Sequence, residues 1–382
     1  MQFINILDFV MVMPLGPDFA HALAIPGSKL GFIGGAYTAA AAVSGLAGSF
    51  FLDRFDRRNA LAVAMLGLGL GTLSGAFATG LPSLLAARVL AGLFGGPATS
   101  LAFSIIADVI PAERRGKAMG AVMGAFSVAS VVGVPIGLEL AQHGGWRMPF
   151  IGTAVLGAAV TTGVITFLPP MRLHLVGRVA GDKGPALREV FERPLVLLSY
   201  SMTAVVMLSG FIIIPNISTY VQENLHFPRA HLSWLYFAGG IVSFFATRLG
   251  GILVDRYGSF KVGSLGAGVL LLTQWMWFMQ VPPPIPLVVL YMIFMLAMGL
   301  RNVSYNTLTS KVPSLRVRAR FMSIQSAVQH AASALGAFLS AQILSELPDR
   351  QLVGMTTVAA VAMGLTAIVP LLLFRVERGV TP

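Results

Sequence analysis

The chain has 382 residues, of which 56% are apolar and 11% are charged, and its mean hydropathy is +0.80. These values lie far from those of a soluble domain and indicate a protein that resides in a lipid bilayer. A net charge of +11 would suggest nucleic acid binding in a soluble protein, and the absence of cysteine excludes disulfides and thiolate metal sites.

Apolar runs of about 20 residues, the length that crosses the hydrocarbon core, recur along the whole chain. We predict twelve membrane-spanning helices, over residues 1–19, 30–52, 59–78, 83–110, 118–141, 149–168, 194–221, 231–254, 262–279, 285–309, 321–345 and 352–374. Short breaks rich in Gly and Pro separate them. The first run has no basic leader and no small-residue cleavage site after it, so we expect a retained helix and not a signal peptide.

The first helix carries a carboxylate inside an apolar run. Asn5 and Asp8 share one helical face, with Met11 at its edge. A charge within a span costs roughly 2.5 to 3.5 kcal/mol on insertion scales, so such residues are functional candidates. We interpret Asp8 as the site that loads and releases a proton, and Arg88 in the fourth helix as its partner. The alternative is a structural ion pair that ties the first helix to the fourth.

Two charged links repeat at a fixed offset. Asp53-Arg54-Phe55 follows the second helix and Asp255-Arg256-Tyr257 follows the eighth, at 255 − 53 = 202 residues. Pro111 and Pro313 share this offset, and a basic cluster follows each. The repeat predicts two equivalent halves, as in many secondary transporters.

We expect these links to form an inner gate, because pairing of their aspartates with neighbouring arginines would hold the inner side closed. The gate residues are Asp53, Arg54, Arg57, Arg58, Asp255 and Arg256.

The fifth helix contains Gly133, Pro135 and Gly137. Proline removes a backbone hydrogen bond and the glycines permit close approach, so we predict a close-packed, hinge-like contact there. Between the halves, residues 169–193 open with Pro169-Pro170 and are predicted to form a cytoplasmic linker with a short helix on the membrane surface. The predicted bundles are residues 1–168 and 194–382.

Mixed polar and adaptable faces in later helices predict a central substrate cavity. Its candidate residues are Asn5, Met11, Asn216, Tyr220, Met298, Arg301, Tyr305, Gln325, Gln329 and His330. Arg301 either binds an anionic group of the substrate or satisfies helix carbonyls. His330 is expected to be a hydrogen-bonded packing residue, and Glu139 a solvated group at the outer mouth. For any single Met or Phe, packing between helices is the simpler reading.

Orientation follows from the basic residues, because short loops rich in Lys and Arg stay in the cytoplasm. Of the 26 Lys and Arg, 19 fall in the links after even-numbered helices or in the C-terminal tail. Both termini are therefore predicted to be cytoplasmic. The positive charge then faces anionic lipid, and no nucleic acid partner is expected.

Several of these motifs are similar to those of a known family. Residues 49–58 resemble the signature Gly, three residues, Asp-Arg-x-Gly-Arg-Arg, with Ser49 and Asp56 at the glycine positions, and the second copy keeps Gly251 and Gly258. Arg88 followed by Gly92 resembles the family's helix 4 signature, and residues 133–137 resemble its antiporter signature. In order and spacing the chain resembles the major facilitator superfamily, in its twelve-helix drug and metabolite:proton antiporter branch.

The resemblance implies an all-α integral membrane protein of two pseudo-symmetric six-helix bundles, working as a monomer in a bacterial inner membrane. It implies proton-coupled export of small amphiphilic drugs or metabolites by alternating access, with no cofactor. The partners expected are a small-molecule substrate, protons and membrane lipids. Proton-coupled or facilitated uptake, and a non-transporting receptor or lipid scramblase, are the alternatives. No HExxH motif or phosphate-binding loop is present, and the 6 His residues have no ligand spacing, so we expect no metal site and no enzyme.

Overall fold

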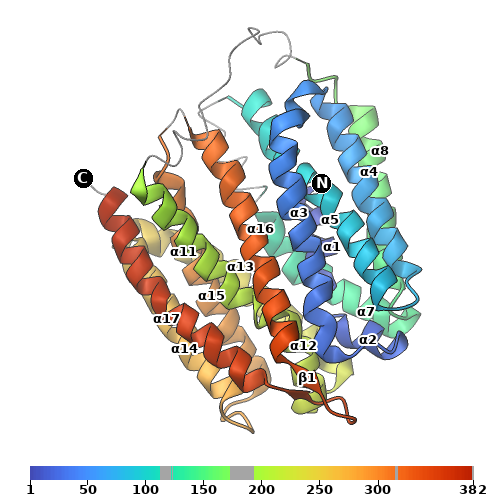
Figure 1. Cartoon of the computed structure of the whole chain (residues 1–382), viewed down its shortest axis with the longest axis vertical. Helices are drawn as coiled ribbons and strands as arrows, with labels where there is room; N and C mark the ends of the chain where they lie inside the picture. Colours follow the sequence, from blue (N-terminus) through green and yellow to red (C-terminus); the bar gives the residue numbers. More distant parts are fainter. Residues whose placement is uncertain (112–121, 123, 173–192, 315–316, 381–382) are drawn as a thin grey trace.

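The computed structural model describes residues 1–380 except 112–121, 123, 173–192 and 315–316. Long helices run side by side along the molecule, with the C-terminus at one end (Figure 1). The helices before residue 170 are α1 (Gln2–Met11), α2 (Gly16–Ala22), α3 (Leu30–Phe51), α4 (Arg57–Ala76), α5 (Leu81–Val109), α7 (Val134–Gly144) and α8 (Met148–Phe167). Those after residue 193 are α11 (Pro194–Phe211), α12 (Ile217–Thr219), α13 (Leu232–Tyr257), α14 (Ser259–Phe278), α15 (Leu287–Lys311), α16 (Arg318–Ile343) and α17 (Met355–Val380).

Short elements join these helices. They are the 3-10 turns η1 (Gly27–Lys29), η2 (Leu52–Arg54), η4 (Ile214–Asn216) and η6 (Arg229–His231), and the π turns η3 (Ala129–Gly133) and η5 (Tyr220–Asn224). Strands β1 (Ser345–Glu346) and β2 (Leu352–Val353) form an antiparallel hairpin, with Ser345 opposite Val353. We call the end of the bundle that carries this hairpin the hairpin end. The opposite end, where α4 begins and α13 finishes, is the link end.

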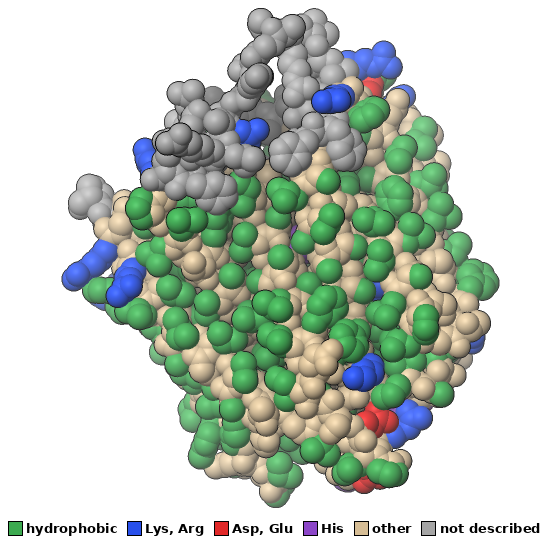
Figure 2. All heavy atoms as spheres, viewed as in Figure 1, with side chains coloured by type: hydrophobic (Ala, Val, Ile, Leu, Met, Phe, Trp, Pro, Cys, Tyr) green, Lys and Arg blue, Asp and Glu red, His purple; other side chains and the backbone are tan. Residues whose placement is uncertain are grey.

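The helices are long and apolar enough for a membrane protein. In the described residues, nine helices could cross a bilayer by length and composition, or ten with the bent pair α1 and α2. The less apolar α14 and α16, of 20 and 26 residues, complete the twelve predicted segments. Figure 2 shows apolar side chains spread over the middle of one face, as a lipid-facing surface requires. The predicted all-α membrane fold is confirmed.

Two predicted spans are not continuous helices. Residues 1–19 were expected to form one helix, but α1 and α2 meet at an angle of 58°. Pro14 lies in the break and Pro17 lies in the first turn of α2, where its missing N–H costs no helical hydrogen bond. The span predicted over 194–221 is locally irregular, because α11 ends at Phe211 and the η4 turn contains Pro215, but residues 194–224 still form one candidate span.

The two halves repeat each other with the offset found in the sequence. Helix α4 spans residues 57–76 and α14 spans 259–278, so both ends differ by 202. The turns η1 and η6 follow the same rule, as do the left-handed residues Ala24, with φ of 51°, and His226, with φ of 52°. The internal repeat therefore extends to helix bounds, turns and backbone torsion angles at positions where the residue types differ.

The halves pack through glycines that permit close approach. A Cβ atom at Gly31 in α3 would lie 2.2 Å from the carbonyl oxygen of Ala337 in α16. A Cβ atom at Gly240 in α13 would lie 2.8 Å from the carbonyl oxygen of Ser130 in η3. Larger side chains would force these helices apart. Most of the segment predicted to be the linker, residues 173–192, lies outside the described part of the chain.

Candidate functional site

Asp8 and Arg88 form a buried ion pair in the first half. Asp8 Oδ1 lies 2.9 Å from Arg88 Nη1, and the two residues are 0% and 1% exposed. Arg88 Nη2 also donates to the backbone carbonyl of Asp8 at 3.3 Å. Asp8 Oδ2 and Arg88 Nε have no hydrogen-bond partner among the described residues. Asp8 thus uses only its Oδ1 atom in the ion pair, and its Oδ2 atom has no hydrogen-bond partner among the described residues.

Polar residues from four helices surround this pair. Thr72 in α4 donates to Asp8 Oδ1 at 2.7 Å, and the Arg88 guanidinium stacks 4.7 Å from the ring centre of Tyr37. Tyr37 in turn donates to Asn5 Oδ1 at 2.6 Å, and Asn5 Nδ2 donates to Thr99 at 2.6 Å. Asn5, predicted to line the cavity, therefore belongs to the network around Asp8.

Arg301 in α15 is the second fully buried arginine. It is 0% exposed, and its Nη1 donates to Ser209 in α11 at 3.0 Å. Its Nη2 donates to the side chain of Asn302 at 3.3 Å, and its Nε has no partner. Within the described residues no carboxylate pairs with Arg301, in contrast to Arg88. Both of its side-chain acceptors are neutral.

The predicted polar face of α16 makes contacts inside the second half. Gln325 donates to Thr203, while its Oε1 atom has no partner among the described residues. Gln329 donates to the Tyr305 hydroxyl at 3.0 Å. No hydrogen bond of the His330 ring occurs within the described part of the chain. Gln325, Gln329 and Tyr305 thus take part in two hydrogen-bonded contacts, and His330 takes part in neither.

The remaining cavity candidates lie at helix breaks or against neighbours. Asn216 ends η4, donates to the carbonyl of Ile212, and leaves its own Oδ1 unpaired. Tyr220 packs against Phe278, with ring centres 5.3 Å apart. Met11 accepts a hydrogen bond from Thr153. Met298 lies near Gly210, where a Cβ atom would be 3.6 Å from its methyl carbon.

The predicted hinge residues border a π turn. The turn η3 ends at Gly133, and α7 begins at Val134 with Pro135 in its first turn. A Cβ atom at Gly133 would lie 2.5 Å from Leu7 in α1, and one at Gly137 would lie 3.9 Å from Met11. Of these two glycines, Gly133 therefore lies closer to α1.

The predicted gate residues lie at the link end. Arg54, Asp255 and Arg256 are exposed, and the side chain of Asp53 lies outside the described part. Arg58 donates to the carbonyl of Leu168 at 3.3 Å, and Arg57 is buried.

Asp56 was not predicted to have a role, yet it organises this end of the first half. It caps α4 by accepting from the Arg58 N–H at 2.9 Å, and it accepts from the Met171 N–H at 3.2 Å and from Arg172 Nε at 3.0 Å. Burial raises the pKa of Asp56, but the hydrogen bonds from Met171, Arg172, Arg58 and Asn59 outweigh it, so the pKa lies below the usual aspartate value. An aspartate before a helical run was a visible capping signal.

At the hairpin end, charged contacts join the two halves. Arg229 donates to both carboxylate oxygens of Asp18, at 2.8 and 2.9 Å, and to the carbonyl of Leu138 at 3.1 Å. Ser233 donates to Glu139 at 2.5 Å, so Glu139 is a contact between halves and not only a solvated group. These partners are far apart in sequence, and no local pattern predicts them.

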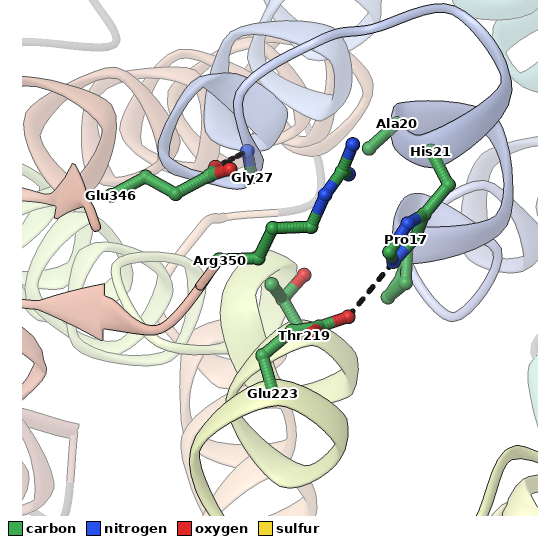
Figure 3. A pocket seen from close by; sticks show the side chains of 8 residues that line it. All are labelled: Pro17, Ala20, His21, Gly27, Thr219, Glu223, Glu346 and Arg350. Carbon is green, nitrogen blue, oxygen red and sulfur yellow. Dashed lines mark hydrogen bonds and ion pairs between the residues drawn. The ribbon is translucent and has the colours of Figure 1, made fainter. Parts of the chain in front are cut away.

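A small cavity of about 10 Å³ lies among the contacts between the halves at the hairpin end (Figure 3). His21 and Glu223 meet across it at 2.9 Å, and Glu346 from β1 accepts from the Gly27 N–H. Arg350 extends from the hairpin toward the first half (Figure 3). The hairpin end is therefore closed in this conformation. Groups of three or more potential metal ligands are absent from the described residues.

The sequence profile described as "Major Facilitator Superfamily" matches residues 1–337 and, in a second match, 199–382. The chain is 27% identical to the chloramphenicol resistance protein of Streptomyces lividans, over 69% of this chain and 67% of that protein. It is 28% identical to the purine ribonucleoside efflux pump NepI of Shigella sonnei, over 70% and 65%. The matched region thus spans about two thirds of these relatives. The fold is similar to that of a bacterial homologue of the human lysosomal transporter Spinster, in an inward-facing and occupied conformation, with a TM-score of 0.78, 16% identity, and coverage of 99% and 94%.

Proposed function

Because the chain belongs to the Major Facilitator Superfamily, we propose that it exports small amphiphilic compounds or metabolites in exchange for protons, with Asp8 as the proton site. It is an integral, multi-pass membrane transporter, and its relatives include efflux proteins and not enzymes. To this family assignment the proposal adds the proton as the coupling ion, export as the direction of transport, and the residues that take part.

The observation that carries the proposal is the Asp8–Arg88 pair. A fully buried ion pair is weak evidence for stability, because desolvation of two charges offsets much of their attraction. An ionisable residue within a span is by default a functional one. Asp8 keeps one oxygen free of partners, which leaves a position for the exchangeable proton.

In the proposed cycle, protonation of Asp8 neutralises the carboxylate and weakens its attraction to Arg88. Arg88 then keeps its stacking on Tyr37, and α1 loses its charged tie to α5. Loading of substrate favours the ionised form, so the proton is released and exchanged for substrate. Residues 1–168 rock against 194–382 about the central interface, and Asp53, Asp255 and their neighbouring arginines close the link end in the opposite state.

The orientation of the chain is part of the same proposal. The hairpin end faces outward and the link end faces the cytoplasm, because the links at that end carry most of the Lys and Arg. The chain then works as a monomer in a bacterial inner membrane. One relative, NepI, is an efflux pump, which agrees with this direction.

The test is proton release from purified protein in weakly buffered detergent after addition of chloramphenicol or inosine. We expect release from the wild type and none from Asp8→Asn, because the amide cannot exchange a proton. Asp349→Asn changes an exposed carboxylate in the hairpin and serves as the control. Release that persists in Asp8→Asn, or no release with any relative's substrate, contradicts the proposal.

A further inference from the structure

The internal repeat places a glycine where the second half should carry a carboxylate. At the offset of 202, Asp8 corresponds to Gly210 and Phe9 corresponds to Phe211. The structure supports this register, because Phe9 and Phe211 contact each other across the interface with ring centres 5.7 Å apart. Equivalent residues of two halves meet in this way only near the axis that relates them.

An arginine reaches this position in both halves. In the first half, Arg88 pairs with Asp8 at 2.9 Å. In the second, Arg301 donates to Ser209, and a Cβ atom at Gly210 would lie 3.6 Å from Arg301 Nη2. The arginines come from α5 and α15, which are equivalent helices, although from different turns. The second half therefore keeps the buried cation and lacks the anion.

An uncompensated guanidinium inside a membrane protein needs an explanation. Its hydrogen bonds to Ser209 and Asn302 satisfy two donors but supply no negative charge, and Nε stays unpaired. A buried charge that lacks its partner is strongly destabilising, because its desolvation is not offset. That penalty is relieved when a ligand brings the missing charge.

We propose that Arg301 binds a carboxylate group of the transported substrate, which occupies the place that Asp8 takes in the first half. A carboxylate matches the planar donors of a guanidinium in two parallel hydrogen bonds. The site lies one residue from Phe211, at the interface between the halves, so a substrate reaches it from whichever end of the interface is open. An aromatic carboxylate would meet Arg301 with its charge and Phe9 and Phe211 with its ring.

This inference rests on the proposed transport function for its substrate, but it makes no use of proton coupling. Binding of 4-phenylbutyrate and of its neutral isostere 4-phenylbutyramide is measured by calorimetry on the full chain in detergent at constant pH. For the wild type we expect the carboxylate to bind about tenfold more tightly than the amide, in line with charge-assisted hydrogen bonds.

Two substitutions should remove this preference by different routes. Arg301→Gln removes the cation, and Gly210→Asp supplies an internal carboxylate that occupies it. Gly210→Asn fills the same space without the charge, so it should weaken binding of both compounds by obstruction, whereas Gly210→Asp should weaken binding of the carboxylate further than that of the amide. Arg301→Lys, which keeps the charge, covers the case in which Arg301→Gln does not fold, and should lower the preference without removing it.

The proposal is overturned if the wild type binds both compounds equally or binds neither, or if the preference persists in Arg301→Gln. Because the readout is binding at one pH, a failure of Asp8 as the proton site would leave this result unchanged. Conversely, loss of the carboxylate preference would leave proton release by neutral substrates intact. The two proposals are therefore tested separately.

Discussion

Asp56 stands where a glycine is expected in the link between α3 and α4, and its carboxylate makes bonds that glycine cannot make. It joins the start of α4 to the two residues Met171 and Arg172, more than 100 positions later in the chain. Capping of a helix by an aspartate contributes about 1 kcal/mol. One side chain thus links three segments at the link end of the first half.

We predict that Asp56→Ala lowers the free energy of unfolding by about 1 to 2 kcal/mol at neutral pH, since it removes a helix cap and a partly exposed ion pair. Asp56→Asn should lose less, because asparagine still caps the helix. The measurement is thermal unfolding in detergent, with Asp349→Asn as the exposed control. Equal melting temperatures for wild type and Asp56→Ala would contradict this account.

The same residue gives a pH dependence with a defined sign. The pKa of folded Asp56 is lowered, so its contribution is complete above the unfolded value, about 3.9, and is lost as pH falls through the lower folded value. The stability difference between wild type and Asp56→Ala should be constant from pH 8 to 5 and should shrink below about pH 4. A difference that grows as pH falls would reverse the assignment.

Single functional candidates could be predicted from the sequence where a charged residue lies within an apolar run. Asp8, Arg88 and Arg301 stood out because a charge in an apolar run is costly, and all three are buried. The partners Thr72 and Tyr37 could not be predicted, because hydroxyl groups are common in membrane helices. Which of them faces Asp8 depends on how the helices pack.

At the scale of helices, the sequence predicted how many spans there are, but not that the first bends and that the seventh contains an irregular turn. Pro14 and Pro215 were visible, but a proline can be accommodated within a continuous membrane helix when neighbours satisfy the freed carbonyls. The break is settled by contacts from the other half. For example, Ser218 donates to the carbonyl of Pro14 at 2.7 Å. The sequence around Ser218 and the sequence around Pro14 do not predict such a contact.

We predict that Gly240→Val separates α13 from η3 and opens the hairpin end. The chain has no cysteine, so Thr219→Cys provides a single reporter in the small cavity, where Thr219 is 3% exposed. Maleimide labelling of this cysteine should be several-fold faster with Gly240→Val. Gly268→Val is the control, because a Cβ atom at Gly268 meets nothing within 4 Å. Equal acceleration by both substitutions would exclude a specific role for Gly240.

At the scale of the whole molecule, the closed hairpin end depends on ion pairs between the halves. Asp18 and Arg229 are about a quarter exposed, so their pair is worth about 1 kcal/mol, near the upper range for exposed pairs. The conformational equilibrium of a transporter is sensitive to energies of this size, because about 1.4 kcal/mol changes a population ratio tenfold.

We predict that Arg229→Gln shifts the equilibrium toward the open hairpin end and accelerates labelling of Thr219→Cys about fivefold, which corresponds to loss of the pair. Arg147→Gln is the matched control, since Arg147 bonds only within its own half, to the carbonyl of Ala76. Asp18→Asn should reproduce the effect, and the double substitution should add little. Additive effects of the two changes would show that the pair does not act as a unit.

The contact between Phe9 and Phe211 has a mechanical consequence. Two equivalent residues that touch near the symmetry axis act as a fulcrum, and displacement in a rocking motion grows with distance from it. The Asp18–Arg229 pair at the hairpin end has a long lever arm and must separate widely. Asp8 and Gly210, each one residue from the fulcrum, travel little. The molecule can therefore swing its two ends through large distances while its buried arginines stay aligned with the groups they bind.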